Sequence, residues 1–121
     1  ATISESSCRF LAGIIAMQFD VYANNGRLAK EIPFVLDIQS DLLSEVLPST
    51  VVVPLYSAKE VIAPVVKLHI PATVRRRRVI AVFNELSSVL QNTFGRKICN
   101  LEEPHGDAFR TALDVLFFNY P

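Results

Sequence analysis

The residues able to carry out chemistry are few in this chain and stand apart in the sequence. It contains two histidines, His69 and His105, and two cysteines, Cys8 and Cys99. It has no glycine-rich phosphate loop, no GxSxG nucleophile elbow, no HExxH zinc motif and no CxxC pair, the spacings that serve defined catalytic or metal-binding geometries. The sequence therefore predicts a protein that is not an enzyme and uses no metal and no cofactor.

Each reactive side chain also has a structural interpretation. His69 falls on the polar side of a predicted strand and indicates a solvated or hydrogen-bonded structural histidine, whereas His105 falls near a helix start and is expected to be exposed. Cys99 stands among aliphatic residues and is expected to be a small core residue. Asp37 and Asp41 are a possible carboxylate pair, but with no partner acid they are expected to belong to a turn.

Four consecutive arginines, residues 75–78, form a dense positive charge. Alternate side chains of a strand point to opposite faces, so one side of this segment must be solvated. We interpret it as a basic edge strand that resists aggregation; docking of an acidic segment or of phosphate is the alternative. The 12 basic and 12 acidic side chains of the whole chain balance, which excludes a polycation that coats nucleic acid by charge alone. No direct sequence-specific binding of nucleic acid is expected.

Composition indicates one globular domain. The chain has 121 residues, of which 50% are hydrophobic, and a mean hydropathy of +0.32. It has no apolar run of about 18 residues, so no membrane span is expected, and we expect a cytoplasmic protein. Met17 is the sole methionine, and a strand pattern starts there. We therefore expect a domain at residues 17–121 and an upstream extension at residues 1–16.

The elements that must position any site are mostly strands. Alternation of apolar and polar residues predicts strands at 17–23, 32–39, 65–70 and 74–83, separated by turns at 24–26 and 71–73. Residues 50–56 are apolar on both faces and predict a buried strand, in which Pro54 marks a bulge or an edge. Residues 44–49 are expected to be a connection, 57–63 one helical turn, and 84–94 a loop followed by a short strand.

The end of the chain changes period. Between residues 108 and 120 the apolar side chains are spaced by one, three and four positions, which is one stripe of a helix. Pro104 suits the first turn of that helix. The stripe consists of Ala108, Phe109, Ala112, Leu113, Leu116, Phe117 and Tyr120. Strands followed by one terminal helix predict a mainly β, α+β fold, such as a small barrel with a helix on it.

The outer face of this helix carries a candidate binding residue. Asp114 and Phe118 are four positions apart and share that face. An exposed aromatic side chain at a chain end is a candidate anchor for a partner. Packing of Phe118 into a homodimer interface is the equal alternative.

These segments together resemble the CcdB toxins of bacterial toxin–antitoxin modules. The motifs that carry the resemblance are MQF at residues 17–19, DIQSDLL at 37–43, VPL at 53–55, PVV at 64–66, HI at 69–70 and ALDVLF at 112–117. The resemblance covers residues 17–120. It implies an SH3-like small barrel of antiparallel strands with a C-terminal helix, assembled as a homodimer.

The resemblance also implies a function. A CcdB-like toxin binds the DNA gyrase A subunit and traps the gyrase–DNA cleavage complex, and a cognate CcdA-like antitoxin neutralises it. The gyrase-binding positions that match the family motifs are Gln18, Phe19, Tyr22, Ser40, Leu42, Asp114, Phe118, Asn119 and Tyr120. The sequence departs from the family at its end, where Asn119 replaces a glycine and Pro121 is added, and at residues 75–78, where the family is rich in methionine.

Two alternatives remain open at this stage. The same barrel fold carries endoribonuclease toxins, and the arginine run would supply the charge that an RNA substrate needs. An inactive member that still binds an antitoxin is the other alternative, because the altered tip enters the partner.

Overall fold

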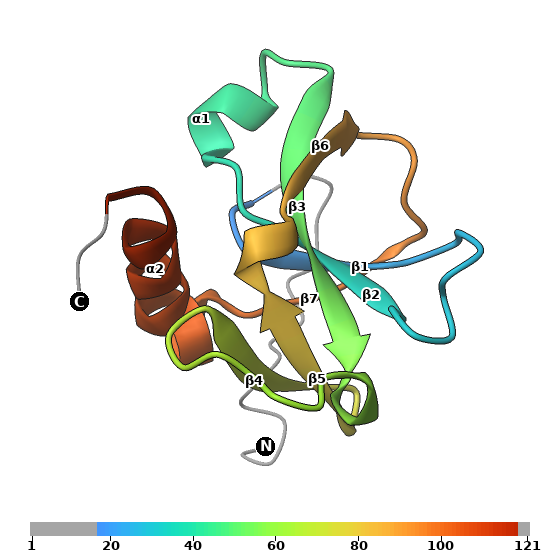
Figure 1. Cartoon of the computed structure of the whole chain (residues 1–121). Helices are drawn as coiled ribbons and strands as arrows, with labels where there is room; N and C mark the ends of the chain where they lie inside the picture. Colours follow the sequence, from blue (N-terminus) through green and yellow to red (C-terminus); the bar gives the residue numbers. More distant parts are fainter. Residues whose placement is uncertain (1–16, 119–121) are drawn as a thin grey trace.

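The computed structural model describes residues 17–118, which form one curled antiparallel sheet with a long helix against it (Figure 1). The mainly β fold class expected from the sequence is confirmed. The strands are β1 (Asp20–Ala23), β2 (Phe34–Asp37), β3 (Ser49–Ser57), β4 (His69–Val74), β5 (Arg77–Val82), β6 (Ser87–Leu90) and β7 (Lys97–Asn100). The helices are α1 (Asp41–Ser44) and α2 (Glu102–Phe118), with 3-10 turns η2 (Ala58–Glu60) and η3 (Phe83–Glu85).

The sheet curls into a half-barrel around β3. Its strand order is β4-β5-β3-β2-β1-β7, and β6 also pairs with β3. One edge of β3 pairs with β2, while the other edge pairs with β6 at Ser49–Val52 and with β5 at Leu55–Ser57. Pro54 lies at this change of partner, where a missing N–H is tolerated. The buried strand predicted at 50–56 is therefore confirmed, and Pro54 marks a local edge rather than a bulge.

Helix α2 closes the hydrophobic core. Its buried residues are Gly106, Phe109 and Ala112. The Phe109 ring lies 5.1 Å from the ring of Phe19 and 5.5 Å from that of Phe83. Burial of such rings supplies much of the stability of a domain this small.

The helix predicted from the apolar stripe is confirmed, but only part of the stripe is buried. Phe109 and Ala112 are buried, whereas Ala108 and Phe117 are exposed. The curled sheet offers α2 a narrow contact, so only one side of the stripe is covered. The last turn of α2 keeps an apolar surface open.

The hairpin of β4 and β5 corrects two predictions, the turn at 71–73 and the basic edge strand at 75–78. The second is wrong because Arg75 and Arg76 lie in a turn and β5, which carries Arg77 and Arg78, lies between β4 and β3. The turn predicted at 71–73 is wrong, because β4 runs through Pro71, which pairs with Ile80. Proline fits there since β4 is an edge strand of the sheet. The chain turns instead at Arg75 and Arg76, between the paired residues Val74 and Arg77.

Two further strand starts differ from the expectation. β1 begins at Asp20 rather than at Met17, because residues 17–19 form a turn, and β4 begins at His69 rather than at Val65. Helix α1 and strand β7 were not predicted. The extension expected at residues 1–16 lies outside the described residues, and within the described part no helix is long and apolar enough to cross a membrane.

The two turn residues of the β4–β5 hairpin have an unfavourable backbone. Arg75 has a φ of 51° and Arg76 a φ of 68°. A two-residue hairpin turn of this kind ordinarily carries asparagine and glycine, because positive φ costs other residues about 1–2 kcal/mol. The turn is therefore less stable with two arginines than it would be with asparagine and glycine.

We therefore expect Arg75→Gly to stabilise the fold. Relief of the positive φ outweighs the greater freedom of glycine in the unfolded chain by about 0.5–1 kcal/mol, which raises Tm by roughly 2–6 °C. Thermal unfolding followed by circular dichroism measures it. Arg78→Gly is the matched control within β5 and should lower Tm; equal effects of the two changes would show that the turn carries no strain.

Candidate functional site

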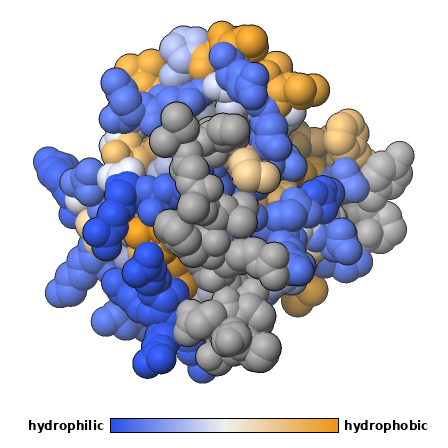
Figure 2. Space-filling view, turned by 180° about the vertical axis from the view of Figure 1, so that it is seen from behind, coloured by the Kyte–Doolittle hydropathy of each residue, from blue (hydrophilic) through white to orange (hydrophobic). Residues whose placement is uncertain are grey.

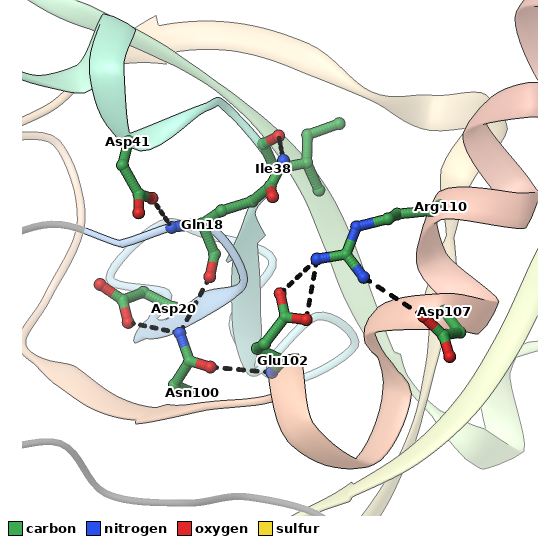
Figure 3. A network of polar contacts seen from close by, with 8 residues as sticks. All are labelled: Gln18, Asp20, Ile38, Asp41, Asn100, Glu102, Asp107 and Arg110. Atoms are coloured by element: carbon green, nitrogen blue, oxygen red, sulfur yellow. Dashed lines mark hydrogen bonds and ion pairs between the residues drawn. The ribbon is translucent and has the colours of Figure 1, made fainter.

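Three of the predicted gyrase-binding residues meet at the start of α1. The Gln18 N–H donates to an Asp41 carboxylate oxygen, and Gln18 Nε2 donates to the Ile38 carbonyl at 3.0 Å (Figure 3). Ser40 caps α1, because its Oγ accepts from the Leu42 N–H at 3.2 Å. The turn at residues 17–19 and α1 are thus fixed to each other.

Leu42 projects from this fixed frame into solvent. Its side chain is 81% exposed, an unusual exposure for a leucine held on an ordered helix. Neighbouring apolar residues Leu43, Val46 and Leu47 are also exposed. In Figure 2 apolar residues gather at the top of the molecule, over α1 and the loop that follows it.

The polar residues before α1 hold its base. Asp37 is buried, and its Oδ1 accepts from Thr50 Oγ1 at 2.8 Å and from the Gln39 N–H at 3.0 Å. Burial raises the pKa of Asp37, against the opposite effect of these two hydrogen bonds. Gln39 is also buried and donates from Nε2 to the Ser49 carbonyl at 3.0 Å. Asp37 therefore has a structural role, as expected from the sequence.

Asp20 is a fully buried carboxylate behind the site. Its Oδ2 accepts from the Met17 N–H at 2.8 Å and lies 3.1 Å from Lys97 Nζ, while its Oδ1 accepts from Asn100 Nδ2 at 3.0 Å. Buried charge is tolerated only with such partners. Asp20 thus joins the turn before β1 to β7.

Asn100 extends this network to α2. Its Nδ2 also donates to the Gln18 carbonyl at 2.9 Å, and its Oδ1 accepts from the Glu102 N–H at 2.8 Å (Figure 3). A side-chain acceptor for a free N–H at a helix start is a helix cap. The residue that orients Gln18 therefore also caps the helix that ends at Phe118.

Phe19 lies inside the molecule. Its side chain has no exposed surface, and its φ is 71°, a strained value for a bulky residue. Its N–H donates to the Asp37 carbonyl at 2.6 Å, and its carbonyl accepts from the Leu101 N–H at 2.9 Å. The Arg110 guanidinium lies 5.3 Å from the ring centroid. Phe19 is therefore placed to hold the turn in position rather than to touch a partner.

The outer face of α2 begins with an ion-paired cluster and ends in an apolar tip. Arg110 donates to both oxygens of Glu102, at 2.6 and 2.8 Å, and to Asp107 at 3.4 Å. Asp114 is exposed one turn further on, and Phe117 and Phe118 are 60% and 65% exposed at the end. Asn119 and Tyr120 lie outside the described residues. α1 and α2 both stand at the left of Figure 1.

Tyr22 belongs to a different cluster. Its ring stacks on Phe94 with centroids 5.0 Å apart, and its hydroxyl donates to Asp20 Oδ2 at 3.4 Å. Burial raises the pKa of Tyr22, and the carboxylates of Asp20 and Asp37 raise it further. The structure thus brings Gln18, Ser40 and Leu42 together and leaves Tyr22 beside β7.

The histidines do not form a catalytic pair. His69 Nδ1 accepts from the Val65 N–H at 2.8 Å, so Nε2 carries the proton toward Asn84 Oδ1 at 3.0 Å; its predicted structural role is confirmed. His105 was expected to be exposed, which is wrong. Its ring is half-buried, 5.8 Å from that of Phe109, and burial lowers its pKa.

The described residues contain no group of three or more metal-binding side chains. Cys99 is 3% exposed, so its predicted place in the core is confirmed.

A comparison with known protein families matches residues 18–118 to the family described as CcdB protein. The chain belongs to the CcdB family. No match was found among the curated proteins. Membership of this family supports a toxin of a toxin–antitoxin system.

The sequence did not reveal the buried polar network of this CcdB-family protein. Asp20 and Gln39 occupy positions that alternation assigned to the solvent face, and no sequence pattern marks Asn100 as buried. One feature of the sequence could have indicated it. Asp20 is an acidic residue within a short apolar strand, and a carboxylate in such a place is either exposed or buried with a partner. The pairing itself needs β7, whose residues are far away in the sequence.

We expect Asp20→Asn to destabilise the fold strongly. The change removes the buried charge that lies 3.1 Å from Lys97 Nζ, and loss of one partner of a buried pair costs about 3–5 kcal/mol. Urea unfolding measures the free energy of unfolding. Asp107→Asn, which removes a solvent-exposed carboxylate beside Arg110, is the control and should leave it unchanged; equal effects would contradict the role of Asp20.

Proposed function

We propose that this CcdB-family toxin binds the DNA gyrase A subunit and stabilises the gyrase–DNA cleavage complex without catalysing a reaction of its own. The observation that carries the proposal is the exposed apolar surface of α1 and the α2 tip, with Leu42 at 81% and Phe118 at 65% exposure. Exposed leucine and phenylalanine side chains on ordered helices are typical binding anchors.

The hydrogen-bonded residues at the start of α1, which support this surface, favour tight binding. Gln18, Ser40 and Asp41 are held by hydrogen bonds before any partner arrives, so little side-chain freedom is lost on association. In this proposal Leu42, Asp114 and Phe118 contact gyrase, with Asn119 and Tyr120 continuing the tip. Phe19 is a positioning residue, and Tyr22 acts through Asp20.

A homodimer is part of the proposal. The apolar surface of Leu43, Val46, Leu47 and Phe117 is larger than a monomer needs to expose. A second copy that covers part of it would give an assembly with two copies of the α2 tip. Such a pair would fit the A-subunit dimer of gyrase, because matched two-fold axes allow both tips to bind.

The proposed antitoxin would use another surface. A groove of about 490 Å³ lies between the loop that joins β1 to β2 and strands β3 and β6, lined mostly by apolar side chains that include Ile32, Tyr56 and Phe94. The Tyr56 hydroxyl donates to Glu85 Oε1 at 2.6 Å at its rim, and this bond raises the pKa of Tyr56 to about 12. A CcdA-like segment could lie there without touching Leu42.

The endoribonuclease alternative has less support. Both ring nitrogens of His69 are hydrogen-bonded, so it is not a free general base. The arginine run begins after Val74, at the far end of β4 from His69, which at strand spacing is roughly 17 Å. The arginine run and His69 are thus too far apart to act on the same phosphodiester bond.

We expect Leu42→Ala and Phe118→Ala to weaken gyrase poisoning while the fold is kept. Truncation of an anchor commonly costs about 2 kcal/mol or more of binding, near thirtyfold in affinity. The measurement is the amount of DNA cleaved by gyrase in the presence of purified protein. Ile62→Ala is the matched control, because Ile62 is a 94% exposed apolar residue on a loop that belongs to neither α1 nor α2.

Three results would change the conclusion. If Ile62→Ala reduced DNA cleavage by gyrase as much as the other two changes, the assignment of gyrase binding to the surface of α1 and the α2 tip would be wrong. No cleavage complex with the natural chain, but one with Asn119→Gly, would favour the inactive member. RNA cleavage that depends on His69 would replace gyrase by the ribonuclease alternative.

A further inference from the structure

A second, strongly basic site lies at the tip of the β4–β5 hairpin. Three segments distant in the sequence build an open pocket of about 300 Å³ there. Its lining consists of Lys30, Ser57, Ala58, Lys59, Arg77 and Arg78. Figure 2 shows strongly hydrophilic residues gathered at the lower left, where this hairpin tip lies.

Four of the six lining residues are cations, and within the described part of the chain none of the four forms an ion pair. Among residues 17–118, no carboxylate forms a salt bridge with Lys30, Lys59, Arg77 or Arg78. The neighbouring acids along the chain, Glu31 and Glu60, do not line the pocket. Because the whole chain has no net charge, this positive potential is a local feature.

One arginine and the backbone of the pocket are held by contacts within the protein. Arg77 Nη2 donates to Ser57 Oγ at 3.2 Å, and its guanidinium lies 5.9 Å from the centroid of the Phe34 ring. The Ser57 N–H donates to the Glu31 carbonyl at 2.8 Å, which fixes the segment that carries Lys30. The Ser57 hydroxyl keeps its own proton free to donate toward an anion.

The adjoining turn supports a role beyond folding. Arg75 and Arg76 occupy positive-φ positions at which asparagine and glycine are preferred. Real proteins break such local rules mostly at functional sites. Here two further cations directly precede Arg77, which lines the pocket.

We propose that this pocket binds a phosphate group of a nucleic-acid backbone without reading sequence. Guanidinium and ammonium groups are the usual ligands of phosphate oxygens. An acidic peptide is a poorer fit, because peptide docking depends on apolar anchors, and Ala58 is the one aliphatic residue of the lining. The inference goes beyond the proposed gyrase binding, which uses the α1 and α2 surface.

The test uses the full chain and a labelled DNA duplex of arbitrary sequence, without gyrase. Fluorescence anisotropy gives the affinity at several salt concentrations. We expect the double variant Lys59→Gln with Arg78→Gln to bind at least about tenfold more weakly, and its slope of log affinity against log salt to be smaller by roughly 2. Inorganic pyrophosphate should displace the duplex from the natural chain.

The control is Lys67→Gln with Arg96→Gln, which removes one lysine and one arginine that are exposed but outside the pocket. This variant should keep the natural affinity and slope. Equal weakening in both variants would show diffuse surface charge and overturn the proposal. No DNA binding at low salt would overturn it as well, as would displacement by an acidic peptide but not by pyrophosphate.

Discussion

A single buried carboxylate organises the side of the molecule that carries the candidate site. Asp20 has no exposed surface, yet it accepts from Met17 and Asn100 and pairs with Lys97. Such a charge is stable only while all of its partners are present. Those partners lie on the turn before β1 and on β7. If either segment moved, the buried Asp20 carboxylate would lose a partner. Asn100 then carries the constraint to α2 by capping its first turn.

This constraint links two segments that carry residues of the proposed binding surface. The turn that Asp20 holds presents Gln18 to α1, and the helix that Asn100 caps ends in the exposed Phe118. The strained φ of Phe19 fits the same picture, because hydrogen bonds and the core hold that residue in place from both sides. The apolar anchors are thus presented on a rigid base, as the proposed binding of CcdB-family toxins to gyrase requires.

Elements with a clear period could be predicted from the sequence, and those set by distant partners could not. The strand β3 could be predicted because burial of both faces gives a continuous apolar run, and α2 because burial of one face gives a helical repeat. The β4–β5 turn was misplaced because Pro71 is a turn signal in the sequence, whereas an edge strand tolerates it. The motif at residues 37–41 pointed to the candidate site only through the family resemblance. The structural role of its side chains could not be predicted, because Gln39 bonds to β3 and Asp41 bonds to the turn at Gln18.

Native-state hydrogen exchange tests the coupling most directly. The amide protons of Phe19, Leu101 and Glu102 lie on the turn and at the start of α2 and are all hydrogen-bonded. If Asp20 and Asn100 bind these segments into one unit, the three amides open with the same free energy and the same dependence on denaturant. A Phe19 amide that exchanges at a clearly lower free energy than Leu101 and Glu102 would show that the turn opens alone, and would contradict this account.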